Sequence, residues 1–422
     1  MIKVIDCPVR ALTGGPEAHF FGYFDKSPWS DDRAETRILS HAISCDTRMP
    51  EPGEEVQLGV VADKAPFVTV AKSRAWNLQQ GAMLQWLKQY PGEILFNDIR
   101  DGRAVSVRKD LRSDKETLYD RPVGIVSPCG LRALSINFGR LSALKPEYGY
   151  AGLVDDFAGQ EVPADDGIFD LDLRSGASRL LISLKAITET GEDGLGEGAV
   201  HYINHPIFNR SGSRFSFVHR YIYPSGTQHT RMLSARADGS DLRLLISGMA
   251  SHSGWRNDHE LLAWAGERKL LRQATAGAGG KLPIGSMLKK VYRLLGKPAI
   301  FKTAVMNDRY IVFDLESGEQ RTVVKGVLRT DGHCSFSSDG RWFVTDTYPD
   351  AKGLAKLYIV HWDTSTVFQI AKLRSPPELD NEIRCDMHPR WHPALPLICI
   401  DSAHSGVRQM YEIDVSKIVQ SL

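Results

Sequence analysis

The sequence lacks most of the features that would assign it to a specialised class of protein. Its six cysteines are scattered over 422 residues without the regular spacing of a disulfide-stapled domain, which favours a reducing, cytoplasmic setting. Lysine and arginine (52 residues) nearly balance aspartate and glutamate (51 residues), so no basic field favours nucleic acid as a partner. No stretch approaches the roughly 18 apolar residues of a transmembrane helix. We therefore expect neither a membrane span nor a signal peptide.

Histidine is missing between His41 and His201 but recurs in a pattern in the second half of the chain. There, four short segments each place a histidine ahead of a turn and an apolar strand, which is how a blade of a β-propeller begins. The first strand of each blade lines the central channel, so histidines at that position would converge on one axis. The four segments are His201-Tyr-Ile-Asn-His205-Pro206, Ser251-His252-Ser-Gly-Trp255, Asp331-Gly-His333-Cys334 and Cys385-Asp-Met-His388-Pro389.

A second recurring pattern is a strand that ends in a polar turn with glycine and is followed by another strand. Aspartate or serine with glycine between two apolar runs is a hairpin signal, because glycine accepts positive φ. Together the two patterns predict an all-β protein, a single seven-bladed β-propeller over residues 1–422 with four-stranded blades. The N-terminal run Ile2–Ile5 is expected to complete the last blade. The hairpin signals lie at Ile94–Gly102, Ile168–Gly176, Leu233–Gly239 and Ile311–Gly318.

One insertion departs from the β pattern. Residues 274–300, within the predicted fifth blade, begin with a glycine-rich linker and continue with helical periodicity and a basic face. We expect a short surface helix between two strands, or a lid or membrane-surface contact. A phosphate-binding loop is disfavoured, because no Gly-Lys-Ser/Thr motif opens the helix.

The repeated histidines also define a candidate metal site. Imidazole and thiolate groups from three successive blades suit Zn²⁺ or a similar divalent ion. The alternative is that these histidines bond to backbone groups and stabilise the channel. Asp386 is a further ligand or a hydrogen-bonding partner of a ligand, and His252 serves either as a fourth ligand or as a free base. The candidate ligands are His252, His333, Cys385 and His388.

A second cluster suggests an acidic saccharide as the ligand. The guanidinium of Arg220 offers a planar fork for a sugar carboxylate, and His205 could remove a proton near neutral pH. In isolation, Arg220 is as readily explained by a structural salt bridge. Aromatic and amide side chains suit sugar rings, although stacking between blades accounts for them equally well. The candidate substrate-binding residues are Gln80, Tyr150 and Asn204.

These segments resemble the oligogalacturonate lyases, which are seven-bladed propellers, and more distantly the propeller-type ulvan lyases. The resemblance covers the blades from His219-Arg220 to Cys385-Asp-Met-His388-Pro-Arg-Trp391 and fades toward the N-terminus. It implies β-elimination at a uronate, with a metal ion beside the substrate carboxylate. His333 and His388 match metal-ligand positions, Cys385 stands where the oligogalacturonate lyases carry glutamine, and manganese is the implied metal. His252 and Arg220 match a histidine and an arginine involved in catalysis or substrate binding.

Two departures from the family pattern bear on this interpretation. A thiolate in place of an amide ligand shifts the preference from Mn²⁺ toward Zn²⁺. The paired histidines in the N-terminal half of the ulvan lyases have no counterpart in the stretch without histidine. The prediction is a cytoplasmic, metal-binding propeller that acts as a lyase on a uronate-containing saccharide. The alternative is a non-catalytic saccharide- or protein-binding propeller with a structural metal.

Overall fold

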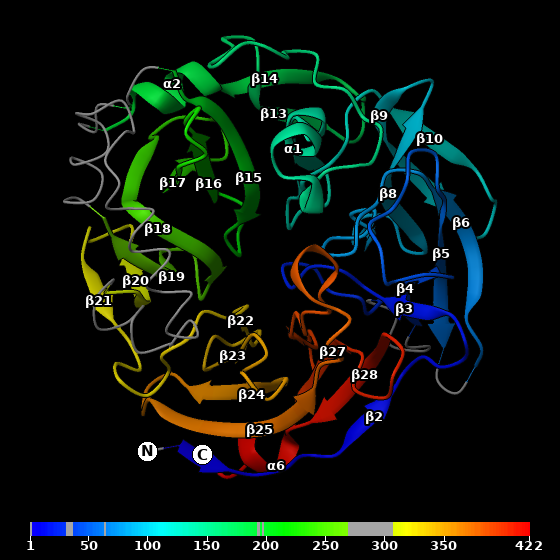
Figure 1. Cartoon of the computed structure of the whole chain (residues 1–422), viewed down its shortest axis with the longest axis vertical. Coiled ribbons are helices and arrows are strands. Elements are labelled where there is room, and N and C mark those ends of the chain that lie inside the picture. Colours follow the sequence, from blue (N-terminus) through cyan, green and yellow to red (C-terminus); the bar gives the residue numbers. More distant parts are fainter. Residues whose placement is uncertain (1, 31–36, 63–64, 192–194, 196–197, 269–306) are drawn as a thin grey trace. The chain divides into compact units, whose positions relative to one another are not determined.

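A computed structural model shows a chain built mostly of β-strands (Figure 1). The structure describes all residues except 1, 31–36, 63–64, 192–194, 196–197 and 269–306. The predicted linker and helix at 274–300 lie outside the described residues. The chain forms two compact units, Met1–Ala158 with Phe169–Arg179 and His333–Leu422, and Gly159–Ile168 with Leu180–Gly332.

Three sheets of the first unit have four strands each and follow the chain strand by strand. The chain passes from one unit to the other at residues 158–159, 168–169, 179–180 and 332–333. The strands are β3 (Ala18–Phe20), β4 (Arg37–Ile43), β5 (Val56–Ala62) and β6 (Val68–Ser73) in one sheet; β7 (Gln85–Trp86), β8 (Glu93–Arg100), β9 (Arg103–Asp110) and β10 (Glu116–Tyr119) in the next; and β11 (Ile125–Val126), β12 (Arg132–Ser135), β13 (Gly167–Asp172) and β14 (Ser178–Ser183) in the third.

The last two sheets of the first unit combine C-terminal strands with strands from the N-terminus. They consist of β22 (Ser335–Phe336), β23 (Trp342–Asp346), β24 (Leu354–His361) and β25 (Thr366–Arg374) with β1 (Ile2–Val4), and of β26 (Arg390–Trp391), β27 (Leu397–Ser402) and β28 (Gln409–Asp414) with β2 (Val9–Ala11).

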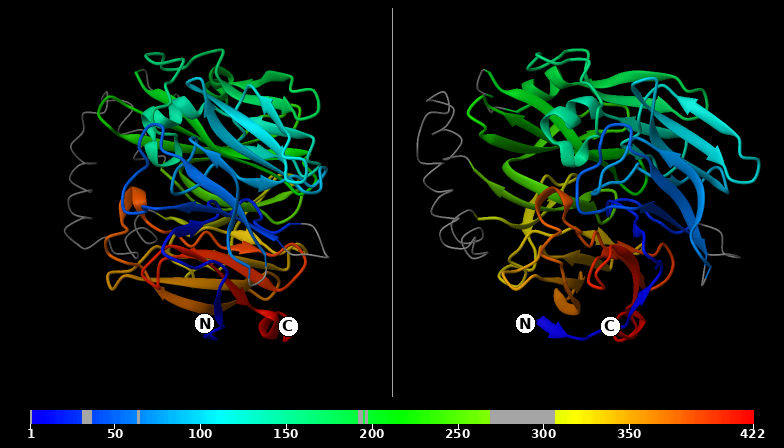
Figure 2. Two further views of the ribbon diagram at one scale, coloured as in Figure 1. Left: turned by 90° about the vertical axis from the view of Figure 1, so that its right-hand side faces the viewer. Right: turned by 45° about the vertical axis from the view of Figure 1, so that its right-hand side comes forward.

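The N-terminal run does not complete the last sheet as predicted. Ile2–Val4 pairs in parallel with β25, and the following strand, Val9–Ala11, pairs with β28 instead. The two ends of the chain lie close together (Figure 2). The run forms a strand as expected, but neighbouring sheets both offer edges with which it could pair, so the sequence could not select the partner.

The second unit contains one seven-stranded antiparallel sheet in chain order. Its central strand, β18, is 13 residues long. The first part of β18 pairs with β17 and the second part with β19, and the register shifts between Ala250 and Ser253. The strands are β15 (Val200–Phe208), β16 (Arg214–Ile222), β17 (Gln228–Arg236), β18 (Arg243–Trp255), β19 (Glu260–Glu267), β20 (Arg309–Asp314) and β21 (Gln320–Thr322).

The predicted outer hairpins are confirmed, and local turn chemistry explains them. After β20, the carboxylate of Asp314 accepts hydrogen bonds from the main-chain N–H groups of Glu316 and Ser317, and Gly318 takes a φ of 79°. The turn after β13 has the same design, with Asp172 as the acceptor and Gly176 at a φ of 77°. Aspartate stabilises the turn while glycine tolerates the left-handed backbone.

Helices are few and short among the described residues. None that the structure describes is long and apolar enough to cross a membrane. The α-helices are α1 (Phe138–Leu144), α2 (Leu184–Glu189) and α6 (Ser416–Val419), and the 3-10 helices are η1 (Pro146–Tyr148) and η2 (Asn381–Ile383).

Candidate metal centre

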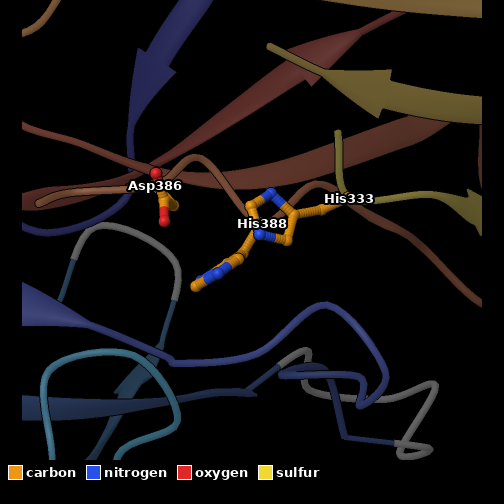
Figure 3. Close-up of side chains that lie close together, drawn as sticks. All are labelled: His333, Asp386 and His388. Carbon is orange, nitrogen blue, oxygen red and sulfur yellow. The ribbon is translucent and has the colours of Figure 1, made fainter. Parts of the chain in front are cut away.

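Three buried side chains of the first unit form a candidate metal site. Ligand atoms of His333, Asp386 and His388 all lie within 4.8 Å of one another. His333 precedes β22, and the other two residues lie between η2 and β26. The three side chains point toward a common space (Figure 3). Two imidazoles and a carboxylate are a donor set that divalent transition metals use.

A carboxylate on β23 fixes the orientation of His333. The imidazole Nδ1 of His333 lies 3.0 Å from both carboxylate oxygens of Asp346, and the main-chain N–H of His333 donates to the same carboxylate at 2.7 Å. Because a carboxylate only accepts, Nδ1 carries the proton and Nε2 presents its lone pair. This carboxylate–histidine arrangement is the one that supports metal-binding histidines in other proteins.

The backbone at His388 has an unusual conformation. The residue takes a φ of 43°, which is rare for residues other than glycine, and Pro389 follows it. The ring of His388 lies edge-on to that of His333, with 4.3 Å between the ring centroids. A strained backbone that directs a side chain into a cluster is typical of functional sites.

Two aromatic residues of the loop after β3 cover the two histidines. The ring centroid of Tyr23 lies 5.0 Å from that of His388, and the centroid of Phe24 lies 5.4 Å from that of His333. The adjacent Gly22 takes a φ of 114°, and a Cβ there would lie 2.7 Å from the carbonyl oxygen of Gln80. Only glycine allows this close approach.

A buried ion pair holds that loop in place. Arg390 is 1% exposed and donates to the carboxylate of Asp401 and to the carbonyls of Gly22 and Tyr23. The main-chain N–H groups of Phe21 and Gly22 donate to Asp401 at 3.2 and 3.3 Å. The pair therefore links β26 and β27 to the loop that covers the histidines.

Arg384 is the charged residue next to the three candidate ligands. Its guanidinium donates to both carboxylate oxygens of Asp386, with Nε at 2.5 Å and Nη2 at 2.9 Å. The guanidinium carbon lies 4.2 Å from the ring centroid of Tyr348, and that ring contacts His333 with 5.9 Å between centroids.

The predicted ligand Cys385 lies in different surroundings. It is 8% exposed and packs with Leu379 and Ala403. Burial raises the pKa of its thiol to about 12, so the thiol is protonated near pH 7 when no metal is bound. Asp386, rather than Cys385, stands with His333 and His388.

The predicted ligand His252 belongs to the second unit. Its Nδ1 lies 3.0 Å from a carboxylate oxygen of Asp331, and the hydroxyl of Ser251 donates to the other oxygen at 2.8 Å. Asp331 therefore holds the proton of His252 on Nδ1, which leaves Nε2 as the acceptor of the ring.

The other candidates of the second unit lie on β15 and β16. Arg220 pairs directly with Tyr202 across the two strands, and Asn204 pairs with Val218. His205 takes a φ of 52° at the bulge that follows Asn204. Asn204 is 1% exposed, and its amide oxygen and nitrogen find no hydrogen-bond partner within the described part of the chain. Leaving a buried amide unpaired is costly, so this position suits a bound polar group or water.

Two further histidines of this unit, His201 and His219, pair with each other. His201 Nδ1 lies 3.0 Å from His219 Nε2, and the rings stack with Tyr221. Burial, followed by the charges of His201 and Arg231, holds the pKa of His219 well below its usual value. His219 is therefore neutral near pH 7.

The two remaining substrate-binding candidates lie in the first unit. Tyr150 is fully buried, stacks on Phe138 and accepts a hydrogen bond from Asn97 at 2.7 Å. Its contacts are those of a packing residue. Gln80 is 7% exposed, and its main-chain N–H donates to Asn77, so it belongs to a tightly bonded loop.

Sequence reasoning missed several residues around the candidate metal site. Asp346 and Tyr348 lie more than ten positions from His333 in sequence and reach it only through the pairing of β22 with β23. Arg384 had a local signal, because it shares an alternating pattern with Asp386 and His388. Residues two apart in an extended segment point to the same side.

Comparisons with known proteins agree on the fold. No family profile and no curated protein matches the sequence. Among solved structures, an oligogalacturonate lyase in complex with manganese is similar at a TM-score of 0.63 and 15% identity, covering 100% of both chains. An oligogalacturonate lyase from Vibrio parahaemolyticus is similar at a TM-score of 0.62 and 13% identity, covering 98% of this chain and 94% of the other.

These similarities confirm the predicted resemblance to the oligogalacturonate lyases. The chain has their mostly β fold over its full length. At this level of identity the likeness shows a shared fold and no more. Activity has to be argued from the residues of this chain.

Proposed function

We propose that this protein binds a divalent metal ion through His333, Asp386 and His388 and cleaves a uronate-containing oligosaccharide by β-elimination. The observation that carries the proposal is the three-residue cluster with its oriented histidine and adjacent cation. A carboxylate of Asp346 fixes the tautomer of His333, and Arg384 places a positive charge beside Asp386. Half-buried Tyr148 and Tyr348 lie near Arg384, and aromatic faces suit sugar rings.

We further propose that residues 1–422 form a single seven-bladed propeller. The five sheets of the first unit and the one sheet of the second make six sheets among the described residues. One part of the long strand β18 pairs with β17, and the other part pairs with β19. Dividing the seven-stranded sheet at β18 gives two four-stranded blades and a total of seven.

The donor set fits a divalent cation. Two imidazoles and a carboxylate suit Mn²⁺ as well as Zn²⁺, because neither ion requires sulfur. The cluster of His333, Asp386 and His388 contains no sulfur ligand, so the argument for zinc that a thiolate would supply does not apply to it. A divalent cation held there would supply positive charge to stabilise the substrate carboxylate and the charge that develops when the C5 proton leaves.

The residues of this chain supply the remaining chemistry of the elimination. A base removes the C5 proton, the C4–oxygen bond breaks, the C4–C5 double bond forms, and the leaving oxygen takes up a proton from the protonated base or from water. We propose His252 or His205 as the base. Asp331 keeps the proton of His252 on Nδ1, so Nε2 is the nitrogen that can accept the C5 proton. Arg220 binds a carboxylate and the buried amide of Asn204 binds a sugar hydroxyl.

The alternative is a non-catalytic propeller with a structural metal. One observation favours it, namely that His333, Asp386 and His388 are only 2%, 7% and 2% exposed. A closed site without an open coordination position is typical of structural metals.

We also propose a cytoplasmic location. The six cysteines are all free, as expected for a protein in a reducing compartment.

The test is turnover of an acidic oligosaccharide by the purified protein. Oligogalacturonate is incubated with the protein and Mn²⁺ or Zn²⁺, and the unsaturated product is followed by its ultraviolet absorbance. The proposal predicts a metal-dependent increase that is lost in His333→Ala and strongly reduced in His252→Gln. Metal-dependent saccharide binding without any unsaturated product would support the non-catalytic alternative and refute the lyase.

A further inference from the structure

Arg384 differs from the neighbouring arginine Arg390 in how its nitrogens are used. Arg390 is fully enclosed, and its donors are taken up by Asp401 and two carbonyls. Arg384 uses Nε and Nη2 for Asp386, and no described residue accepts a hydrogen bond from its Nη1. Its side chain is 23% exposed, whereas that of Asp386 is 5% exposed. Arg384 is therefore a charged side chain that contacts both this buried cluster and solvent.

The position of Arg384 is well defined. Its carbonyl accepts a hydrogen bond from Gln79 at 3.0 Å, and its N–H donates to Asn381 at 3.3 Å. Its guanidinium lies over the ring of Tyr348, a geometry that favours a cation and restricts the rotation of the side chain. A guanidinium held in this way loses little conformational entropy when it binds a ligand.

The charge balance of the cluster favours an anionic ligand. Asp386 carries the carboxylate that faces both Arg384 and the two histidines. Once a divalent cation shares that carboxylate, the dication and the guanidinium carry three positive charges against the two carboxylates of Asp386 and Asp346, a surplus of one positive charge. A carboxylate is the planar, singly charged group that matches a guanidinium edge.

We propose that Arg384 is the specificity-determining residue that binds the carboxylate of the acidic ligand beside the metal centre. This inference rests on the proposed function, because it presumes an acidic saccharide at this site. It assigns to Arg384 the carboxylate that lies beside the metal ion, while Arg220 stays the residue proposed for another carboxylate of the oligosaccharide. Through Tyr348 the guanidinium is separated from His333 by a single ring.

The test compares binding of digalacturonate with binding of its neutral methyl ester, both in the presence of Mn²⁺, by calorimetry. The wild type is expected to prefer the acid. In Arg384→Gln, we expect the acid to bind about 10- to 100-fold more weakly while the ester is unaffected, because one charged hydrogen-bonded contact is lost. Arg384→Lys keeps the charge but not the planar fork of the guanidinium. Its affinity for the acid is therefore expected to lie between that of the wild type and that of Arg384→Gln.

The matched control is Arg174→Gln. Arg174 and Asp172 have the same two-residue spacing, and the guanidinium of Arg174 donates to both oxygens of Asp172 at 3.3 and 2.7 Å. That pair lies at the turn after β13, so the control should leave both affinities unchanged. Mn²⁺ titration of each variant establishes that the metal centre is retained.

Each outcome separates the inference from the function on which it rests. If the wild type binds neither saccharide, the proposed function and the inference both fail. If the wild type prefers the acid and Arg384→Gln keeps that preference, the inference alone is overturned. Loss of Mn²⁺ from Arg384→Gln together with loss of the acid would also overturn it, since Arg384 would then support the metal centre instead of the ligand.

Discussion

Two buried pairs of histidines, one in each unit, have different partners. In the first unit, His333 is held by the carboxylate of Asp346 and faces His388 and Asp386. In the second unit, His201 and His219 bond to each other and stack with Tyr221. A carboxylate that fixes the ring and a second carboxylate within reach form a candidate cation site, whereas two imidazoles that bond to each other and stack with a tyrosine are packed against one another. The residues around a histidine therefore decide what it can do.

The largest expected effect is loss of the metal in His333→Ala or His388→Ala. Each variant removes one of three donors, so we expect affinity for Mn²⁺ or Zn²⁺ to fall at least about 100-fold. The counterpart in the second unit, His219→Ala, should bind metal as the wild type does. Titration of the three metal-stripped variants measures the difference. Equal losses in all three would show that the comparison between the units is mistaken.

The next largest effect concerns the ion pair that supports the loop over the histidines. Arg390→Met leaves the carboxylate of Asp401 buried without its partner, and we expect a loss of about 3–5 kcal/mol in the free energy of unfolding. The exposed pair of Arg10 and Glu412, with Arg10 55% exposed, is the control. Arg10→Met should cost less than about 1 kcal/mol. Denaturant unfolding compares the two, and similar costs would contradict the role given to Arg390.

A smaller effect is expected from the carboxylates that orient the two candidate ligands His333 and His252. Asp346→Asn weakens the support of His333, and we expect a 10- to 100-fold loss of metal affinity, equivalent to about 1.4–2.7 kcal/mol. Asp331→Asn makes the equivalent change at His252 in the second unit and should leave metal affinity unchanged. If Asp331→Asn also loses metal, His252 is a ligand after all.

The smallest effect is a dependence of stability on pH. Burial lowers the pKa of His41 to about 3, while the neutral ring accepts the N–H of Ala82 at 3.0 Å. An unfolded histidine titrates near 6.5. His41 therefore stabilises the fold fully above that pH, and its contribution is lost as the pH falls toward 3. We expect about 0.7 kcal/mol to be lost between pH 7 and pH 6.

The measurement is the slope of unfolding free energy against pH in the wild type and in His41→Gln. The variant is less stable at every pH, so only the slopes are compared, and the slope should be smaller in His41→Gln. Unchanged slopes would mean that other groups dominate. His219→Gln tests the second unit in the same way, because the pKa of His219 is also held low.

The sequence predicted the features that local chemistry controls. The outer hairpins followed from aspartate and glycine at fixed offsets, and His333 and His388 followed from their repeated position before a strand. Whether Cys385 or Asp386 joins the two histidines as a candidate ligand depended on which side of an extended segment each side chain occupies. In an extended segment, residues three apart, such as Cys385 and His388, are expected on opposite sides, whereas residues two apart, such as Asp386 and His388, are expected on the same side.

Other features could not be predicted, because they depend on pairing between distant strands. Asp346 reaches His333 through the register of β22 and β23, and Tyr23 reaches His388 through a loop from the far end of the chain. The prediction of the partner of the N-terminal run was wrong for the same reason, because the edges of two neighbouring sheets were both available to this run. Periodicity identifies a strand, but it does not identify the neighbours of that strand.

The central claim is that His333, Asp386 and His388 hold a divalent cation without Cys385. X-ray absorption spectroscopy of the zinc-loaded protein tests it most directly. The predicted result is a first shell of nitrogen and oxygen at about 2.0–2.2 Å, with the signature of two imidazoles. A sulfur contribution at about 2.3 Å would return Cys385 to the site and contradict the account, as would a protein that binds no zinc.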